Sequence, residues 1–180
     1  MLTMKRIISV FIFASIIITI DSVANRSSID RLRKAFHESV LHPEELSVFL
    51  EVVESIQLPT PIERAYIGAA EALRARETWN PISKITHLNR FRALLAEAIN
   101  EDAQNLEIRF LRYSIEFNIP KFLRSDIIMA EDKSVIMNEI MNIDQFTIDQ
   151  SFIIYILTLF EDTKTCTIEE IALIKSKLKG

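Results

Sequence analysis

Apolar residues recur every three or four positions along most of this chain, and prolines separate the stretches that show this spacing. A repeat of that length marks one face of an α-helix, whereas a strand would alternate apolar and polar residues. No stretch alternates in that way between two turn signals. The pattern predicts an all-α fold of about eight helices in antiparallel helix hairpins, over the ranges Ile29–Leu41, Pro43–Ile56, Pro61–Thr78, Pro81–Asn100, Leu106–Asn118, Ile127–Asn142, Ile148–Asp162 and Ile168–Lys179.

Several of these helices carry a recognisable first turn. Ser28 and Thr167 stand where a side-chain oxygen caps the first backbone N–H groups of a helix. Thr60 does the same for the third helix, with Pro61 at the first helical position and Glu63 placed to complete a capping box. These signals fix where the helices begin.

The fifth helix has two apolar stripes on opposite sides. Ile108, Leu111 and Ile115 form one stripe, and Phe110, Tyr113 and Phe117 form the other. A helix that is apolar on two opposed faces has neighbours on both sides, so we expect an interior helix of a layered array.

Two other helices have distinct packing surfaces. The third shows one broad face of small residues that lets another helix approach closely, namely Ala65, Gly68, Ala69, Ala72 and Ala75. The segment Phe152–Phe160 is apolar nearly all round but too short to span a bilayer, so we expect a buried helix near the end of the array.

The first 24 residues resemble a secretory signal peptide. Lys5 and Arg6 precede the apolar run Ile7–Ile20, and Ser22 and Ala24 are small residues at the positions that precede a cut. We predict cleavage after Ala24, a periplasmic or secreted location, and one helical domain over residues 25–180. A leader retained as an anchor is the alternative, although the run is shorter than the roughly 20 residues of a spanning helix.

Composition excludes several classes of function. The chain has only two glycines, Gly68 and Gly180, so neither a Rossmann nor a P-loop phosphate loop can be assembled. Its net charge is −4, without a block of basic residues, which argues against a nucleic-acid partner. The single cysteine, Cys166, cannot form an intrachain disulfide and is interpreted as a small buried apolar residue.

Charged residues on the third and fifth helices form the main candidate site. Arg64, Glu71, Arg109, Arg112 and Glu116 are predicted to lie in a polar seam between helices. Such a seam could clamp an anion, because the arginine guanidinium binds planar anions in a fork. The favoured interpretation is structural, with the arginine stems packed and their charged heads paired to carboxylates.

Two further features were weighed for function. His37 and His42 are five residues apart and Pro43 follows, so they lack the i, i+4 spacing of a zinc-protease helix. Trp79 lies at the turn between the third and fourth helices, where it could contact a partner. We expect it instead to pack over the helix ends. No catalytic residue, metal ligand or cofactor is predicted.

Part of the chain resembles the tetratricopeptide repeat. "AYIGAAEAL" (65–73), followed by "LLAEAINEDAQNLEIRFL" (94–111), is similar to one repeat unit that runs into the next. Gly68 and Ala98 match its small positions and Asp102-Ala103 its turn. The spacing from Gly68 to Ala98 is about eleven residues longer than the repeat, Ala103 replaces proline, and Tyr113 stands where a small residue is usual.

The segment with "WNP", "EIRFLRYS" and "NIP" also resembles a group of uncharacterised exported proteins of Gram-negative bacteria. These resemblances imply a tetratricopeptide-like helical array in the cell envelope and supply no catalytic residue. The function we expect is that of a non-catalytic protein-interaction or scaffold module with an unidentified envelope partner. The alternative is a small anionic-ligand binder or an enzyme that uses the arginine seam.

Overall fold

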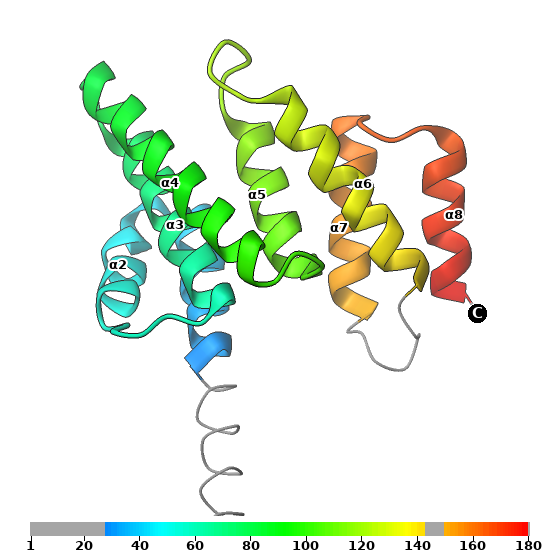
Figure 1. Cartoon of the computed structure of the whole chain (residues 1–180), viewed down its shortest axis with the longest axis horizontal. Helices are drawn as coiled ribbons and strands as arrows, with labels where there is room; N and C mark the ends of the chain where they lie inside the picture. Colours follow the sequence, from blue (N-terminus) through cyan, green and yellow to red (C-terminus); the bar gives the residue numbers. More distant parts are fainter. Residues whose placement is uncertain (1–27, 143–149, 180) are drawn as a thin grey trace, which may run out of the picture. The chain divides into compact units, whose positions relative to one another are not determined.

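The computed structural model describes residues 28–142 and 150–179, and these residues form an all-α fold without a strand (Figure 1). A helix over residues 28–41 comes first. The following elements are η1 (Pro43–Glu45), α2 (Leu46–Glu54), α3 (Pro61–Glu77), α4 (Pro81–Glu101), α5 (Leu106–Asn118), α6 (Asp126–Asn142), α7 (Gln150–Thr163) and α8 (Ile168–Lys179). The predicted fold class and the approximate number of helices are therefore confirmed for the described part of the chain.

Local chemistry explains where these helices begin. The Thr60 hydroxyl accepts from the backbone N–H of Glu63, whose carboxylate in turn accepts from the Thr60 N–H, which is the predicted capping box. Asn80 caps α4 through the N–H groups of Ile82 and Ser83. The predicted helix over Pro43–Ile56 begins instead with the 3₁₀ turn η1, in which the Leu46 N–H bonds to the Pro43 carbonyl. Ile148 and the leader with its cut after Ala24 lie outside the described residues.

The chain divides into two compact units, one ending at Leu58 and the other beginning at Pro59, where we had predicted a single domain over residues 25–180. The boundary falls in "QLPTP", where Pro59 and Pro61 flank the break between α2 and α3 and the Leu58 side chain is 92% exposed. Within the first unit, Leu32 and Phe49 are buried and the Phe36 and Phe49 ring centroids lie 5.5 Å apart.

The second unit contains three helix hairpins, α3–α4, α5–α6 and α7–α8, joined end to end (Figure 1). In the first hairpin the small face of α3 lies against α4. A Cβ built on Gly68 would lie 2.3 Å from Leu95 Cδ2 and 3.3 Å from the Phe91 carbonyl oxygen. Glycine is therefore what permits the close approach of these two helices.

Helix α5 is an interior helix of this unit. Ile108 and Leu111 of one predicted stripe are buried, and so are Phe110 and Tyr113 of the other. It contacts α3, α4 and α6, and its Tyr113 ring lies edge-on to Phe160 of α7 with centroids 5.3 Å apart. The expectation that both apolar sides of this helix are covered is confirmed.

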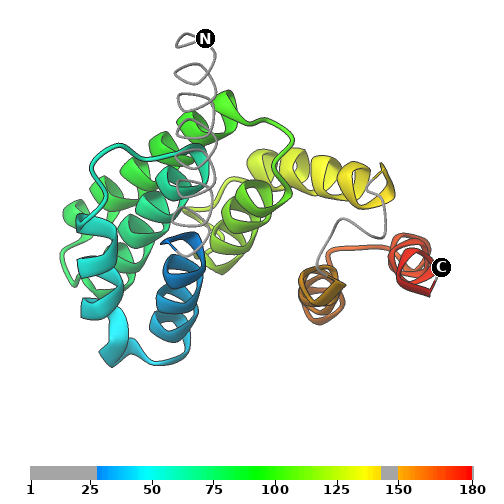
Figure 2. The same cartoon turned by 90° about the horizontal axis from the view of Figure 1, so that it is seen from below.

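The C-terminal part of the unit has one apolar core to which α5, α6, α7 and α8 contribute, although α7 is only half covered. Ile153, Ile156 and Phe160 of α7 are buried, but Ile154 and Tyr155 are 51% and 57% exposed. The prediction of a fully buried α7 is wrong, because the neighbouring helices cover one of its sides only. Figure 2 shows α7 near the end of the helix series.

Within the described residues, no helix combines the length and the apolar character that crossing a membrane requires.

Candidate functional site

Arg109 and Arg112 of α5 form a buried cluster with two consecutive acids of α6, Glu131 and Asp132. The Arg112 guanidinium binds Asp132 in a fork, with Nε to Oδ2 at 2.7 Å and a second nitrogen to Oδ1 at 2.6 Å. One Arg109 nitrogen donates to Glu131 at 2.6 Å and to Asp132 at 3.0 Å. Both arginine side chains are 7% exposed and that of Asp132 is fully buried. We call these four residues the arginine cluster.

The arginine cluster is electrically balanced, with two guanidinium groups facing two carboxyl groups. Burial raises the pKa of Asp132, and the hydrogen bonds from Arg112 and Arg109 act in the opposite direction. The hydrogen bond from Arg109 lowers the pKa of the half-exposed Glu131. The Arg109 Nε also donates to the Ala103 carbonyl at 2.9 Å. Two of the three nitrogens of each guanidinium therefore already donate to acceptors of the chain itself.

Glu116, the third predicted member of the seam on α5, lies in a different contact. It is fully buried and accepts from Arg92 of α4, whose Nε is 2.6 Å from Glu116 Oε1. The Ser125 N–H also donates to Glu116, at 3.1 Å, and Arg92 donates to the Leu123 carbonyl at 2.6 Å. This contact fastens the α5–α6 loop to α4.

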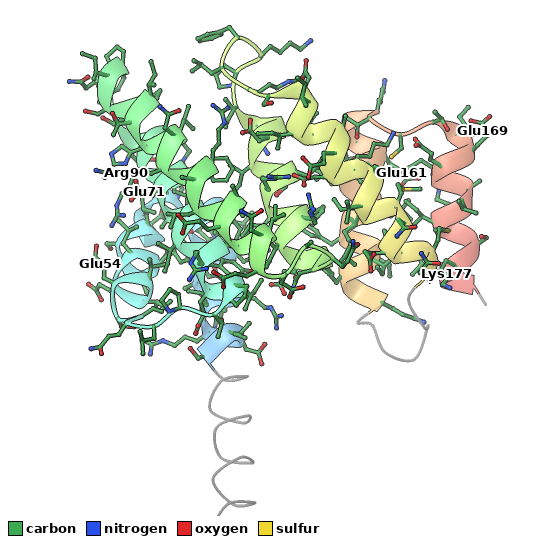
Figure 3. All side chains as sticks on the ribbon, in the orientation of Figure 1. Glu54, Glu71, Arg90, Glu161, Glu169 and Lys177 are labelled. Atoms are coloured by element: carbon green, nitrogen blue, oxygen red, sulfur yellow. The ribbon has the colours of Figure 1, made fainter. Side chains whose placement is uncertain are left out.

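The two predicted seam residues of α3 lie in two further contacts. Glu71 accepts from Arg74 at 2.7 Å, lies 2.8 Å from His87 Nδ1 and is 3.9 Å from Arg90, which is labelled beside it in Figure 3. Arg64 pairs with Glu101 and lies 3.8 Å from Glu97, both of which are at the far end of α4. The five seam residues are therefore distributed over four separate ion-pair contacts between or within helices.

Sequence reasoning missed the partners of these residues. Asp132 had an available signal, because it lies three residues after Met129 and four before Ile136, on the side of α6 that faces the core. An acid on an apolar stripe indicates a buried ion pair. Arg92 carried the same kind of signal, because it lies four residues after the buried Leu88 and three before the buried Leu95. Glu131 and His87 had no comparable signal.

Trp79 is 99% exposed, so the expectation that it packs over the helix ends is wrong. It precedes Asn80, whose side chain caps α4. Ile82, at the start of α4, is 78% exposed. The exposure of Trp79 favours the alternative interpretation, a contact with a partner.

The histidine and cysteine candidates lie in ordinary environments. His42 lies 3.9 Å from Glu44, and no group of three or more histidine, cysteine or acidic residues in the described ranges is placed to hold a metal. Cys166 is half-buried, and burial raises the pKa of its thiol to about 11 although Lys133 is close. A thiol of that pKa is a poor nucleophile at neutral pH.

No family model matches this chain, and neither the curated proteins nor the solved structures contain a match to it. The tetratricopeptide resemblance and the resemblance to exported bacterial proteins therefore remain expectations from sequence.

Proposed function

We propose that this chain is a non-catalytic protein-interaction or scaffold module of the cell envelope. The envelope location is supported by the signal-peptide pattern of the first 24 residues. The interaction role is supported by the outer face of α7, defined here by Ile154 and Tyr155. The exposure of these two apolar side chains is the observation on which the proposal rests.

The outer face of α7 exposes two large apolar side chains in its middle, Ile154 and Tyr155, between polar residues at its two ends. A surface helix normally has polar residues opposite its buried side, and a helix that is apolar all round is normally buried. In α7 the exposed Ile154 and Tyr155 follow directly on the buried Ile153. The only packing of Tyr155 on another aromatic ring is edge-on to Phe110, at 5.5 Å between centroids, among the rings that the structure describes.

A repeat array normally ends in an element with a polar outer face, which keeps the array soluble. Here the polar outer side of α7, with Thr158, Glu161 and Asp162 exposed, is interrupted by Ile154 and Tyr155. Leu173 of the adjacent α8 is also 48% exposed. A helix of a partner protein, laid against the outer face of α7, would complete its burial in the way that α5 is buried within this chain.

The arginine cluster gives no support to the alternative of a small-anion binder or enzyme. Arg109 and Arg112 are 7% exposed and balanced by Glu131 and Asp132, so an incoming anion would have to displace a carboxylate of the chain. An arginine whose guanidinium N–H groups faced no carboxylate of the chain would have favoured the anion binder.

Affinity capture from envelope extract tests the proposal. We expect the tagged wild-type chain to retain one protein in stoichiometric amount, and Ile154→Glu to lose it because the new charge would be desolvated in the contact. Asn89→Glu, which adds the same charge at an exposed position of α4, is the control and should retain it. Equal capture by all three chains would contradict the proposal.

A further inference from the structure

A second exposed apolar surface lies at one end of the second unit. The α3–α4 turn and the α5–α6 loop are at the same end of the antiparallel helices, at the top in Figure 1. The first carries Trp79 and Ile82, which are 99% and 78% exposed, and the second carries Phe122 and Ile127, which are 84% and 83% exposed. We call these four residues the turn surface.

The turn surface is made of protruding tips. Trp79 and Phe122 stand on the connections between helices, Ile82 and Ile127 stand in the first turns of α4 and α6, and each of the four is at least three-quarters exposed. A protein partner would need a separate pocket for each tip, whereas a fluid lipid surface accepts isolated apolar tips without matching them. Tryptophan in particular favours the boundary between lipid headgroups and hydrocarbon.

Unpaired positive charge accompanies both connections, the α3–α4 turn and the α5–α6 loop. Arg76 pairs with Glu77 at 2.8 Å, and Arg124 pairs with Asp126 at 2.7 Å, so the acids nearest the tips are engaged. Lys84 and Lys121 remain, and no carboxylate of the described residues lies within ion-pair distance of either. A net positive end is unusual in a chain whose overall charge is −4.

The opposite end of the same helices is acidic. Glu97 and Glu101 at the end of α4, Asp102 in the α4–α5 turn and Glu107 at the start of α5 lie there, with Arg64 as a basic counterpart. A module with a positive end and a negative end is oriented by the field of a charged surface. An anionic surface would attract the end that bears the apolar tips.

We propose that the turn surface docks this module on an anionic lipid bilayer, with Trp79 and Phe122 inserted at the headgroup level and Lys84 and Lys121 facing anionic headgroups. This goes beyond the proposed function, because the outer face of α7 is left for the protein partner and the turn surface is assigned to lipid. The chemistry resembles that of other peripheral proteins, in which apolar burial and attraction to anionic lipids act together.

The third hairpin turn provides a matched control. Ile168 at the start of α8 is 85% exposed, comparable with Phe122. Its neighbours are acidic, since Asp162 and Glu169 accompany a single Lys164, and Glu169 is labelled at the start of α8 in Figure 3. If apolar exposure alone decided vesicle binding, Ile168 and Phe122 would contribute equally to it. Docking on an anionic bilayer predicts that only Phe122 contributes.

Fluorescence of Trp79 tests the proposal directly, because it is the only tryptophan of the chain. The wild-type chain and its variants are purified in the form that the expressing cells produce, so that all share one N-terminus. Each is then mixed with phosphatidylglycerol or phosphatidylcholine vesicles. We expect a blue shift and quenching by brominated lipid with the anionic vesicles only, weakened by added salt. Phe122→Ser and the pair Lys84→Glu, Lys121→Glu should each reduce vesicle binding about tenfold.

Ile168→Ser should bind anionic vesicles like the wild-type chain. Trp79 emission that anionic vesicles leave unchanged would overturn the proposal and leave Trp79 for a protein contact. Equal losses of vesicle binding from Phe122→Ser and Ile168→Ser would also overturn it. Ile154→Glu should keep vesicle binding, so this test and the capture experiment on the outer face of α7 fail independently.

Discussion

At the scale of single residues, the buried charges of this protein are organised as local pairs. Asp132, Glu116 and Glu71 each receive at least one arginine, and no buried side-chain nitrogen or oxygen of the described residues is left without a hydrogen-bond partner. Because a buried charge without a partner costs several kcal/mol, this complete pairing explains why so many ionised groups are tolerated inside a helical array.

Glu71 gives these pairs a pH dependence. Burial raises its pKa, but the hydrogen bonds and charges of His87 and Arg74 outweigh that effect, so the pKa lies below its ordinary value of 4.5. An acid whose pKa is lowered by folding stabilises the fold above its unfolded pKa, and that stability is lost as the pH falls through the folded value.

We therefore predict that Glu71→Gln lowers the free energy of unfolding by about 1–2 kcal/mol at neutral pH and has less effect near pH 3. Urea unfolding at several pH values measures this difference. Glu77→Gln, which removes an exposed acid of the same helix, serves as the control. A deficit that stays constant down to pH 3 would show that Glu71 does not act through its charge.

The sequence predicted residue environments unevenly. It placed the caps at Thr60 and Thr167 correctly because each acts on the backbone a few positions away, within one local segment. It could not place Arg112 against Asp132, or Arg92 against Glu116, because these pairs depend on how separate helices align. Trp79 was misjudged for a related reason, since whether a turn residue packs depends on which helix ends lie near it.

At the scale of the elements, the α3–α4 hairpin depends on a glycine inside a helix. Glycine destabilises a helix interior by about 1 kcal/mol relative to alanine, so Gly68 is retained against local propensity. The contacts a Cβ would make with Leu95, Leu94 and the Phe91 carbonyl explain why.

We predict that Gly68→Ala lowers the free energy of unfolding by about 1 kcal/mol, because overpacking in a core costs about 1–3 kcal/mol and exceeds the gain in helix propensity. Gly68→Val should cost more. Thermal unfolding followed by circular dichroism measures both, with Ala93→Gly at an exposed position of α4 as a control for propensity alone. A Gly68→Ala chain more stable than the wild type would mean that α3 and α4 are not closely packed here.

The helix pattern also predicted α5 well and α7 poorly. Both apolar stripes of α5 are covered because it lies inside the array, with α3 and α4 before it and α6 after it. The apolar pattern of α7 is equally continuous, but helices α5, α6 and α8 reach only one side of it. Periodicity reports which faces avoid water, and it does not say whether the covering partner belongs to the same chain.

At the scale of the whole molecule, the second unit combines a closed interior with two distinct exposed surfaces. The arginine cluster joins α5 to α6, and the Lys133 ammonium joins α6 to the α7–α8 turn by donating to the Thr165 carbonyl at 2.9 Å and to Glu170 at 2.7 Å. The outer face of α7 and the turn surface remain outside these networks. Buried ion pairs join the helices around the apolar core, and the exposed apolar side chains are the ones that we propose for contact with partners.

Substitution of Arg109 tests this central claim most directly. We predict that Arg109→Ala lowers the free energy of unfolding by about 3–5 kcal/mol, because it leaves Asp132 with an incomplete set of partners in the interior. Glu131→Gln, at the half-exposed member of the cluster, should cost about 1 kcal/mol or less. Denaturant unfolding of the three chains, with calorimetric titration of phosphate and acetate, provides the measurement. A wild-type chain that binds neither anion and an Arg109→Ala chain with the predicted loss of stability agree with the account. An Arg109→Ala chain of unchanged stability that has lost binding of an anion would contradict it.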